Sequence, residues 1–119
     1  MKQIPLLAAV AALAIAGAAQ AHAFLDHADP KVGSVVAHAP QSLRLHFTEP
    51  VVAAACRVSV AGPPGFAGAG PARPAPGDAK SLVVELRGPA PPGRYVVHWR
   101  VISVDTHATS GDFAFTVRP

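Results

Sequence analysis

The sequence has few of the features that identify most enzymes. Its 119 residues include one cysteine, one methionine and one tryptophan, and charged residues make up only 14%. A single cysteine, Cys56, cannot form an internal disulfide, so we expect it to be a small buried apolar residue. No G-x-S-x-G serine elbow is present, which argues against a hydrolase. The length excludes Rossmann, TIM-barrel and multidomain enzymes.

Positive charge is spread thinly along the chain. The formal net charge is +3, and the arginines occur singly between Arg44 and Arg118, without a run or a helical stripe. Nucleic-acid-binding domains gather their basic residues on one face or along one helix. We therefore expect no nucleic-acid partner.

The longest apolar run lies at the N-terminus. It follows Lys2 and ends at residues 19–21 in A-Q-A, a motif of small residues. A short apolar run that ends in such a motif is typical of a secretory signal peptide rather than a permanent membrane span. We therefore expect a signal peptide over residues 1–21 and a single secreted domain over residues 22–119.

The remaining sequence consists of short Val-containing runs separated by Pro and Gly. Leu43, Leu45 and Phe47 alternate with polar residues, as expected for a half-buried strand. No apolar pattern of helical period is sustained, so the composition predicts an all-β sandwich. A long mobile loop is expected over residues 61–77, which are rich in Gly and Pro. The expected strands are residues 22–28, 42–47, 51–60 (best at 55–60), 81–87, 93–102 and 111–117.

Cleavage after Ala21 would make His22 the first residue of the mature chain. The free α-amine and the imidazole Nδ1 of an N-terminal histidine close a six-membered chelate ring on a metal ion. Neutral nitrogens in one plane suit Cu(II), which prefers tetragonal N and O coordination. Cleavage after Ala23 is the alternative, because A-H-A is also a motif of small residues, and it would remove the chelate.

The triplet Asp105-Thr106-His107 is a second candidate metal-binding feature. If this segment is extended, residues 105 and 107 project to the same side. His107 would then supply an imidazole nitrogen and Asp105 a carboxylate oxygen, giving an N₃O set with His22. A D-x-H triplet is also common on solvated surfaces, so the spacing alone leaves both interpretations open.

Three blocks of sequence resemble the CopC-type copper-resistance proteins. They are HAFLDHADPKVGSVV from His22, LRLHFTEPV from Leu43, and GRYVVHWRVISVDTHATSGDFAFTV from Gly93. The last block contains the distinctive pattern W-R-x-x-S-x-D-T-H-x-x-S-G. The resemblance covers most of residues 22–119 and is weakest over about 61–80.

The resemblance implies a fold, a location and a site. The fold would be a cupredoxin- or immunoglobulin-like Greek-key β-barrel or sandwich of about seven strands, in the periplasm. A Cu(II) ion would be held by His22, Asp105 and His107, and Glu49 would orient the N-terminal amine by a hydrogen bond. Some relatives also bind Cu(I) in a methionine-rich loop, but the only methionine here is Met1, so we expect the Cu(II) site alone.

The resemblance also implies a role without catalysis. A monomeric carrier would buffer copper or deliver it, and its partner would be a separate CopD-type inner-membrane protein or a copper enzyme. Two alternatives remain: a copper-dependent oxidative enzyme of the histidine-brace type, and a metal-free β-sandwich interaction module. The other histidines are interpreted as surface residues: His27, His38, His46 and His98.

Overall fold

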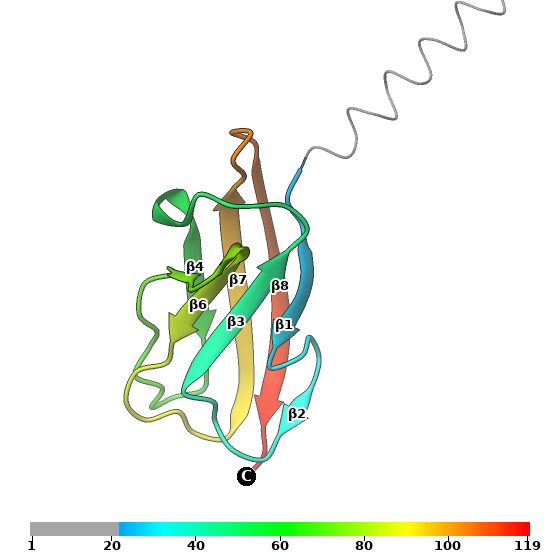
Figure 1. The fold of residues 1–119 in the computed structure, drawn as a ribbon. Helices are drawn as coiled ribbons and strands as arrows, with labels where there is room; N and C mark the ends of the chain where they lie inside the picture. The colour runs from blue at the N-terminus through cyan, green and yellow to red at the C-terminus, as the bar shows by residue number, and fades with distance from the viewer. Residues whose placement is uncertain (1–21) are drawn as a thin grey trace, which may run out of the picture.

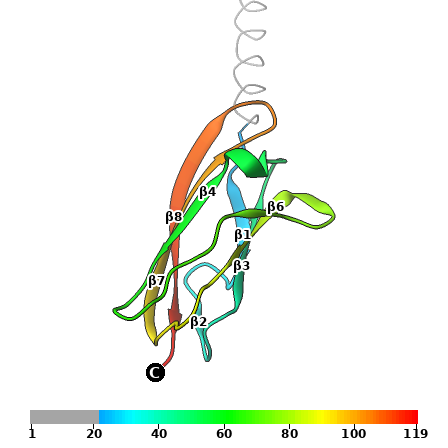
Figure 2. The same cartoon turned by 90° about the vertical axis from the view of Figure 1, so that its left-hand side faces the viewer.

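Two four-stranded β-sheets pack face to face in the computed structural model, which describes residues 22–119 (Figures 1 and 2). The predicted signal peptide, residues 1–21, lies outside the described residues. The first sheet has the strand order β1-β3-β6-β5 and the second β2-β8-β7-β4. The strands of the first sheet are β1 (Leu25–Asp29), β3 (Ser42–Phe47), β6 (Asp78–Glu85) and β5 (Arg73–Ala75). Those of the second are β2 (Val35–Val36), β8 (Ala108–Val117), β7 (Gly93–Ile102) and β4 (Arg57–Ala61).

Antiparallel pairing dominates both sheets. β7 and β8 form a hairpin that runs in register from Gly93 opposite Val117 to Ile102 opposite Ala108. The exception is β2, which pairs parallel to β8 at the edge of the second sheet. The all-β sandwich expected from the composition is therefore confirmed. Within residues 22–119, no helix has the length and apolar character needed to cross a membrane.

The core lies between the two sheets and follows the alternation of the strands. On β7 every second side chain, from Tyr95 to Val101, is buried, while His98 points outward and is exposed. Aromatic rings fill much of the core: Phe47 meets Trp99 edge-on at 5.3 Å, and Tyr95 stacks on Phe115 at 5.2 Å between ring centroids. Cys56 is 3% exposed, as expected for a small buried apolar residue.

The strands with clean alternation are predicted most accurately. β3 and β7 have the expected bounds, whereas β6 and β8 each begin three residues earlier than expected. The run at 51–60 divides into a short 3-10 helix η1 (Ala53–Ala55) followed by β4. The interpretation of residues 61–77 as one long loop is wrong in part, because β5 lies within it and pairs with β6.

Gly111 on β8 is placed where no side chain fits. A Cβ atom added there would lie 2.6 Å from Cζ2 of the Trp99 indole, which is 5% exposed. We expect Gly111→Ala to lower the free energy of unfolding by about 1–3 kcal/mol, because an overpacked core must shift a large ring. Gly70→Ala is the matched control, since its Cβ would meet nothing closer than 3.6 Å. Urea unfolding of both variants measures the difference, and equal stabilities would contradict the prediction.

Candidate functional site

Two histidine rings meet at the end of the sandwich where the described chain begins. The imidazoles of His22 and His107 lie 4.5 Å apart between ring centroids. The carboxylate of Asp105 is close to the same point, with Oδ2 3.2 Å from Nδ1 of His107. His22 comes from the N-terminal segment and the other two from the loop between β7 and β8 (Figure 2). The structure thus brings together the three residues expected to bind metal.

The N-terminal segment is held in place from both sheets. Thr109 on β8 donates its hydroxyl to the carbonyl of Ala23 at 2.5 Å, and the Ala23 side chain is fully buried. On the other side, Thr48 donates its backbone N–H to the Phe24 carbonyl at 2.8 Å. The Phe24 N–H returns a bond to the Thr48 hydroxyl at 3.0 Å. His22 is therefore positioned by its two successors, although it lies outside the strand that begins at Leu25.

The segment that carries Asp105 and His107 is a turn, so the condition of an extended chain at this triplet is not met. Ser103 N–H donates to the His107 carbonyl at 3.0 Å, and Thr106 N–H donates to the Ser103 carbonyl at 2.9 Å. Thr106 has a φ of 72°, in the left-handed region that β-branched residues seldom occupy. The turn, rather than the alternation of a strand, places the Asp105 carboxylate beside the His107 ring.

Asp105 is held as an anion by its neighbours. The buried hydroxyl of Ser103 donates a hydrogen bond to Oδ1, and this bond is the main cause of the lowered pKa of Asp105. His107 lowers the pKa further through a hydrogen bond and its charge, while partial desolvation acts in the opposite direction. Asp105 is therefore ionised at neutral pH. Two imidazoles and a carboxylate form a donor set of the kind that Cu(II) prefers.

Glu49 lies at the same end of the molecule and is half-buried. Its neighbour Thr48 approaches the carbonyl of His22 with a hydroxyl–oxygen distance of 3.5 Å. Its other neighbour, Pro50, accepts a 3.1 Å hydrogen bond from the N–H of Val104, beside Asp105. The Glu49 side chain itself makes no hydrogen bond or ion pair with the rest of the described chain, so its role beside the N-terminal amine stays a prediction.

A second group of metal-binding side chains lies on the outer face of the first sheet. Its two histidines, His27 and His46, are predicted from the sequence to be surface residues rather than metal ligands. They lie opposite each other on β1 and β3, and Asp26 joins them. The register of two strands decides whether such residues meet, and the sequence carries no direct signal of that register.

Of the remaining histidines, His38 is exposed and His98 is exposed beside one carboxylate. The Nδ1 of His98 lies 2.5 Å from Oδ1 of Asp112, the residue opposite it on β8. Both residues fit the surface role expected from the sequence. His98 and Asp112 form an isolated pair, without the third ligand that the group around His46 has.

Comparison with known proteins gives consistent matches along nearly the whole described domain. A family model for the CopC domain matches residues 25–118. The copper resistance protein C of Escherichia coli is 36% identical over 113 residues, covering 89% of each chain. Protein YobA of Escherichia coli K12 is 37% identical over 99 residues, covering 82% of this chain and 80% of that protein.

Solved structures match over the same region. CopC from Methylosinus trichosporium OB3b has a TM-score of 0.73 and 31% identity, covering 82% of this chain and 95% of that one. PcoC, a methionine-rich copper resistance protein from Escherichia coli, has a TM-score of 0.71 and 34% identity, covering 82% of this chain and all of that one. The chain therefore belongs to the CopC family.

Proposed function

We propose that this protein is a periplasmic carrier that binds one Cu(II) ion and buffers or delivers it. The observation that carries the proposal is the meeting of His22, Asp105 and His107 at one end of the sandwich. The ring centroids of the two histidines are 4.5 Å apart, and the ionised Asp105 carboxylate lies 3.2 Å from Nδ1 of His107. Relatives named copper resistance protein C support copper as the metal.

Removal of the signal peptide after Ala21 would complete the site. The α-amine and Nδ1 of His22 would form one chelate, a nitrogen of His107 would be the third nitrogen donor, and Asp105 would supply the oxygen. Glu49 would accept a hydrogen bond from the amine and orient it, as outer-shell carboxylates do at other metal sites. The mature domain has no methionine, so it offers no thioether sulfur, the soft ligand that favours Cu(I).

The same donor set favours a role in carrying copper over a role in redox catalysis. Three nitrogens and a carboxylate in a tetragonal arrangement stabilise Cu(II) relative to Cu(I), which disfavours redox cycling. A monomer would then exchange its ion with a separate CopD-type membrane protein or with a copper enzyme. A copper-loaded protein that consumed peroxide with ascorbate faster than free copper would contradict a role as a carrier.

The assignment of ligands is tested by substituting histidines one at a time. In a chain that begins at His22, we expect His107→Ala to weaken Cu(II) binding by more than about tenfold, because one in-plane nitrogen is lost. His38→Ala is the control, since His38 is exposed and far along the chain from the three candidate ligands. Competitive titration gives the affinities, and EPR counts the nitrogen donors. Equal affinities in the two variants would mean that the ligands are wrongly assigned.

Binding of the ion is also expected to stabilise the fold. Cu(II) at a free concentration well above its dissociation constant should raise the unfolding temperature, because the ion binds the folded chain in preference to the unfolded one. A thousandfold excess corresponds to about 4 kcal/mol. Thermal unfolding with and without copper measures the shift, and a chelator should reverse it. An unchanged midpoint would favour the metal-free interaction module.

A further inference from the structure

The outer-face cluster, defined as Asp26, His27 and His46, has the composition of a metal site. Each residue offers one ligand atom, and these atoms all lie within 4.8 Å of one another. We propose that this cluster is a second, independent binding site for a divalent transition-metal ion that accepts imidazole nitrogen and carboxylate oxygen, such as Zn²⁺ or Cu²⁺. It shares no residue with the site at the N-terminal end.

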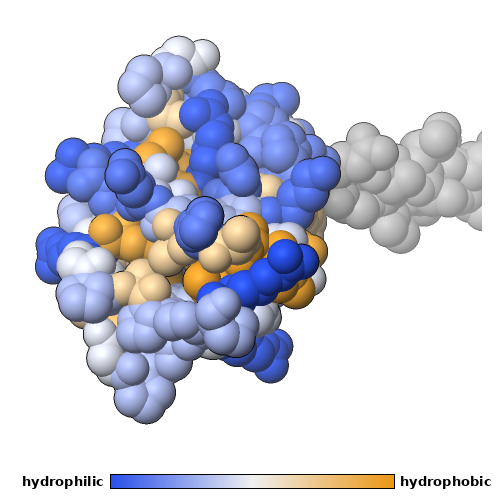
Figure 3. Space-filling view, turned by 90° about the horizontal axis from the view of Figure 1, so that it is seen from below, coloured by the Kyte–Doolittle hydropathy of each residue, from blue (hydrophilic) through white to orange (hydrophobic). Residues whose placement is uncertain are grey.

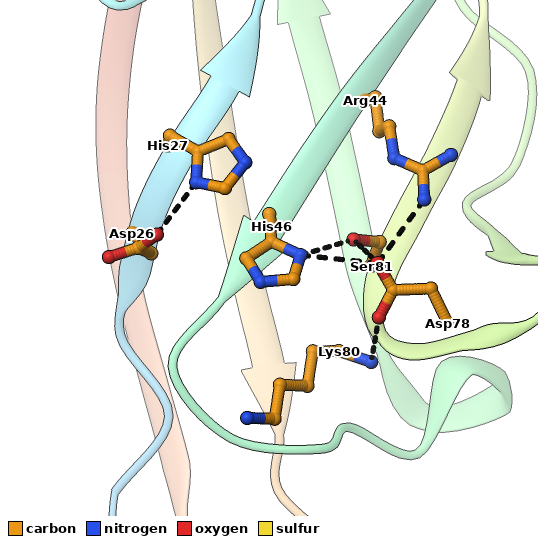
Figure 4. Close-up of polar contacts among 7 residues, drawn as sticks. All are labelled: Asp26, His27, Arg44, His46, Asp78, Lys80 and Ser81. Atoms are coloured by element: carbon orange, nitrogen blue, oxygen red, sulfur yellow. Dashed lines mark hydrogen bonds and ion pairs between the residues drawn. The ribbon is translucent and has the colours of Figure 1, made fainter.

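A β-bulge brings Asp26 and His27 to the same face. In the β1–β3 ladder, Leu25 pairs with Phe47 and His27 pairs with His46, so Asp26 is an extra residue on β1. In a regular strand neighbours point to opposite faces, but here Asp26 and His27 are both exposed and Ala28 is buried. Bulges commonly redirect side chains beside functional sites. This bulge turns an adjacent Asp-His pair toward a second histidine (Figure 4).

The contacts at Nδ1 of His46 orient its ring and leave Nε2 available to a metal ion. The Ser81 hydroxyl donates to Oδ2 of Asp78 at 2.7 Å. The Ser81 oxygen is therefore free to accept a hydrogen bond from Nδ1 of His46, which lies 2.7 Å away, and Oδ2 of Asp78 lies 3.2 Å from the same nitrogen. With the proton on Nδ1, the Nε2 atom carries the lone pair. Metal-binding histidines are oriented by carboxylates in this way.

The two other ligands are free to move onto an ion. The side chains of His27 and Asp26 are 68% and 55% exposed, and Nδ1 of His27 lies 2.6 Å from Oδ2 of Asp26. An exposed pair of this kind contributes little stability, so breaking it costs little. The rings of His27 and His46 already stack at 4.6 Å between centroids. Metal–nitrogen bonds are about 2.0–2.1 Å long, so the three side chains would adjust until their ligand atoms converge on one ion.

The charges around the cluster allow a cation to bind and limit the affinity of that binding. Asp78 is ionised, with a pKa of about 2 caused mainly by its hydrogen bond from Ser81, and it is paired with Arg44 at 3.2 Å. Asp26 and His27 line a surface pocket that also contains Lys31, so an ion can approach but meets one positive charge. Asp26 supplies the only carboxylate ligand. The cluster should therefore bind less tightly than the chelate site.

The test uses Zn²⁺ as the probe on a chain in which the N-terminal site is disabled. A His107→Ala chain with one glycine before His22 lacks that site, so its outcome does not depend on the proposed carrier function. We expect one equivalent of Zn²⁺ to bind by calorimetric titration, and the NMR signals of the His27 and His46 rings to shift.

Substitutions assign the ligands. His27→Asn is expected to weaken Zn²⁺ binding by at least about tenfold, and His46→Asn by a similar factor, since asparagine retains a donor for Ser81. His98→Asn is the matched control, because His98 also pairs with one carboxylate on an exposed strand face. The proposal is overturned if no zinc binds, if half an equivalent binds between two chains, or if His27→Asn and His98→Asn have the same effect. Should His46→Asn unfold, the highly exposed His27 still decides the outcome.

Discussion

A chain that begins at His22 is expected to bind Cu(II) more than about a hundredfold more tightly than the same chain with one glycine added before it. The extension turns the α-amine into an amide, which no longer offers a basic lone pair, and the chelate ring is lost. Outer-shell changes alone reduce metal affinity by about 10–100-fold, so the loss of a direct ligand together with its chelate should exceed that range. His107 and Asp105 stay in place in both chains.

The matched control carries the same glycine after Pro119, at the opposite end of the chain, where Arg118 and Pro119 are exposed. This chain should bind Cu(II) as tightly as the authentic one. Mass analysis of the secreted protein belongs to the same experiment, because a chain that begins at Phe24 would lack His22 altogether. Equal affinities for the chains with and without the N-terminal glycine would refute the chelate.

Truncation of Phe47 is expected to lower the free energy of unfolding of the metal-free protein by about 3–5 kcal/mol, the range found when a large buried aromatic is reduced to alanine. Phe47 has no exposed surface and packs edge-on against Trp99, so its removal leaves a cavity in the core between the sheets. Domains of this size are stable by only about 5–15 kcal/mol. A large part of the fold's stability therefore depends on one ring.

Phe24→Ala is the control for this experiment, because Phe24 is 53% exposed although its backbone is hydrogen-bonded to Thr48, the residue that follows Phe47. Its substitution should change stability by less than about 0.5 kcal/mol. Urea unfolding at 25 °C measures both variants, and a variant of Phe47 that is already unfolded in water meets the expectation. If both variants lost a similar amount of unfolding free energy, the burial of each ring in the structure would not predict its contribution to stability.

The parts of the fold that the sequence predicts are those governed by local alternation. β3 and β7 are recognisable because every second residue is apolar and because Pro or Gly marks the start of each strand. β5 escapes prediction because its three residues, Arg73–Ala75, include a proline and have no alternation of their own. Proline is tolerated there because β5 is an edge strand. The backbone groups along its outer edge have no neighbouring strand to pair with.

The candidate metal-binding residues also divide into those that a local sequence pattern predicts and those that it does not. His22 is predicted from the expected cleavage site and Asp105 and His107 from the D-x-H triplet, because both are local patterns within blocks that resemble a known family. The turn that joins Asp105 to His107 is not predicted, since it depends on Thr106 adopting a left-handed conformation. The outer-face cluster depends on one bulge and on the register of β1 against β3, and neither follows from residues considered one segment at a time.

The path of the chain from β1 to β2 also decides which strand edges of the two sheets are covered. β1 pairs along the outer edge of β3, and β2 pairs with the edge of β8, so residues 25–36 cover one side of both sheets (Figures 1 and 2). Uncovered strand edges are templates for intermolecular pairing. At the far end of the molecule, apolar surface is already interspersed with hydrophilic surface (Figure 3). A protease that cut within residues 30–34 would leave β1 attached to the domain only through its pairing with β3, and loss of β1 would expose the edge of β3.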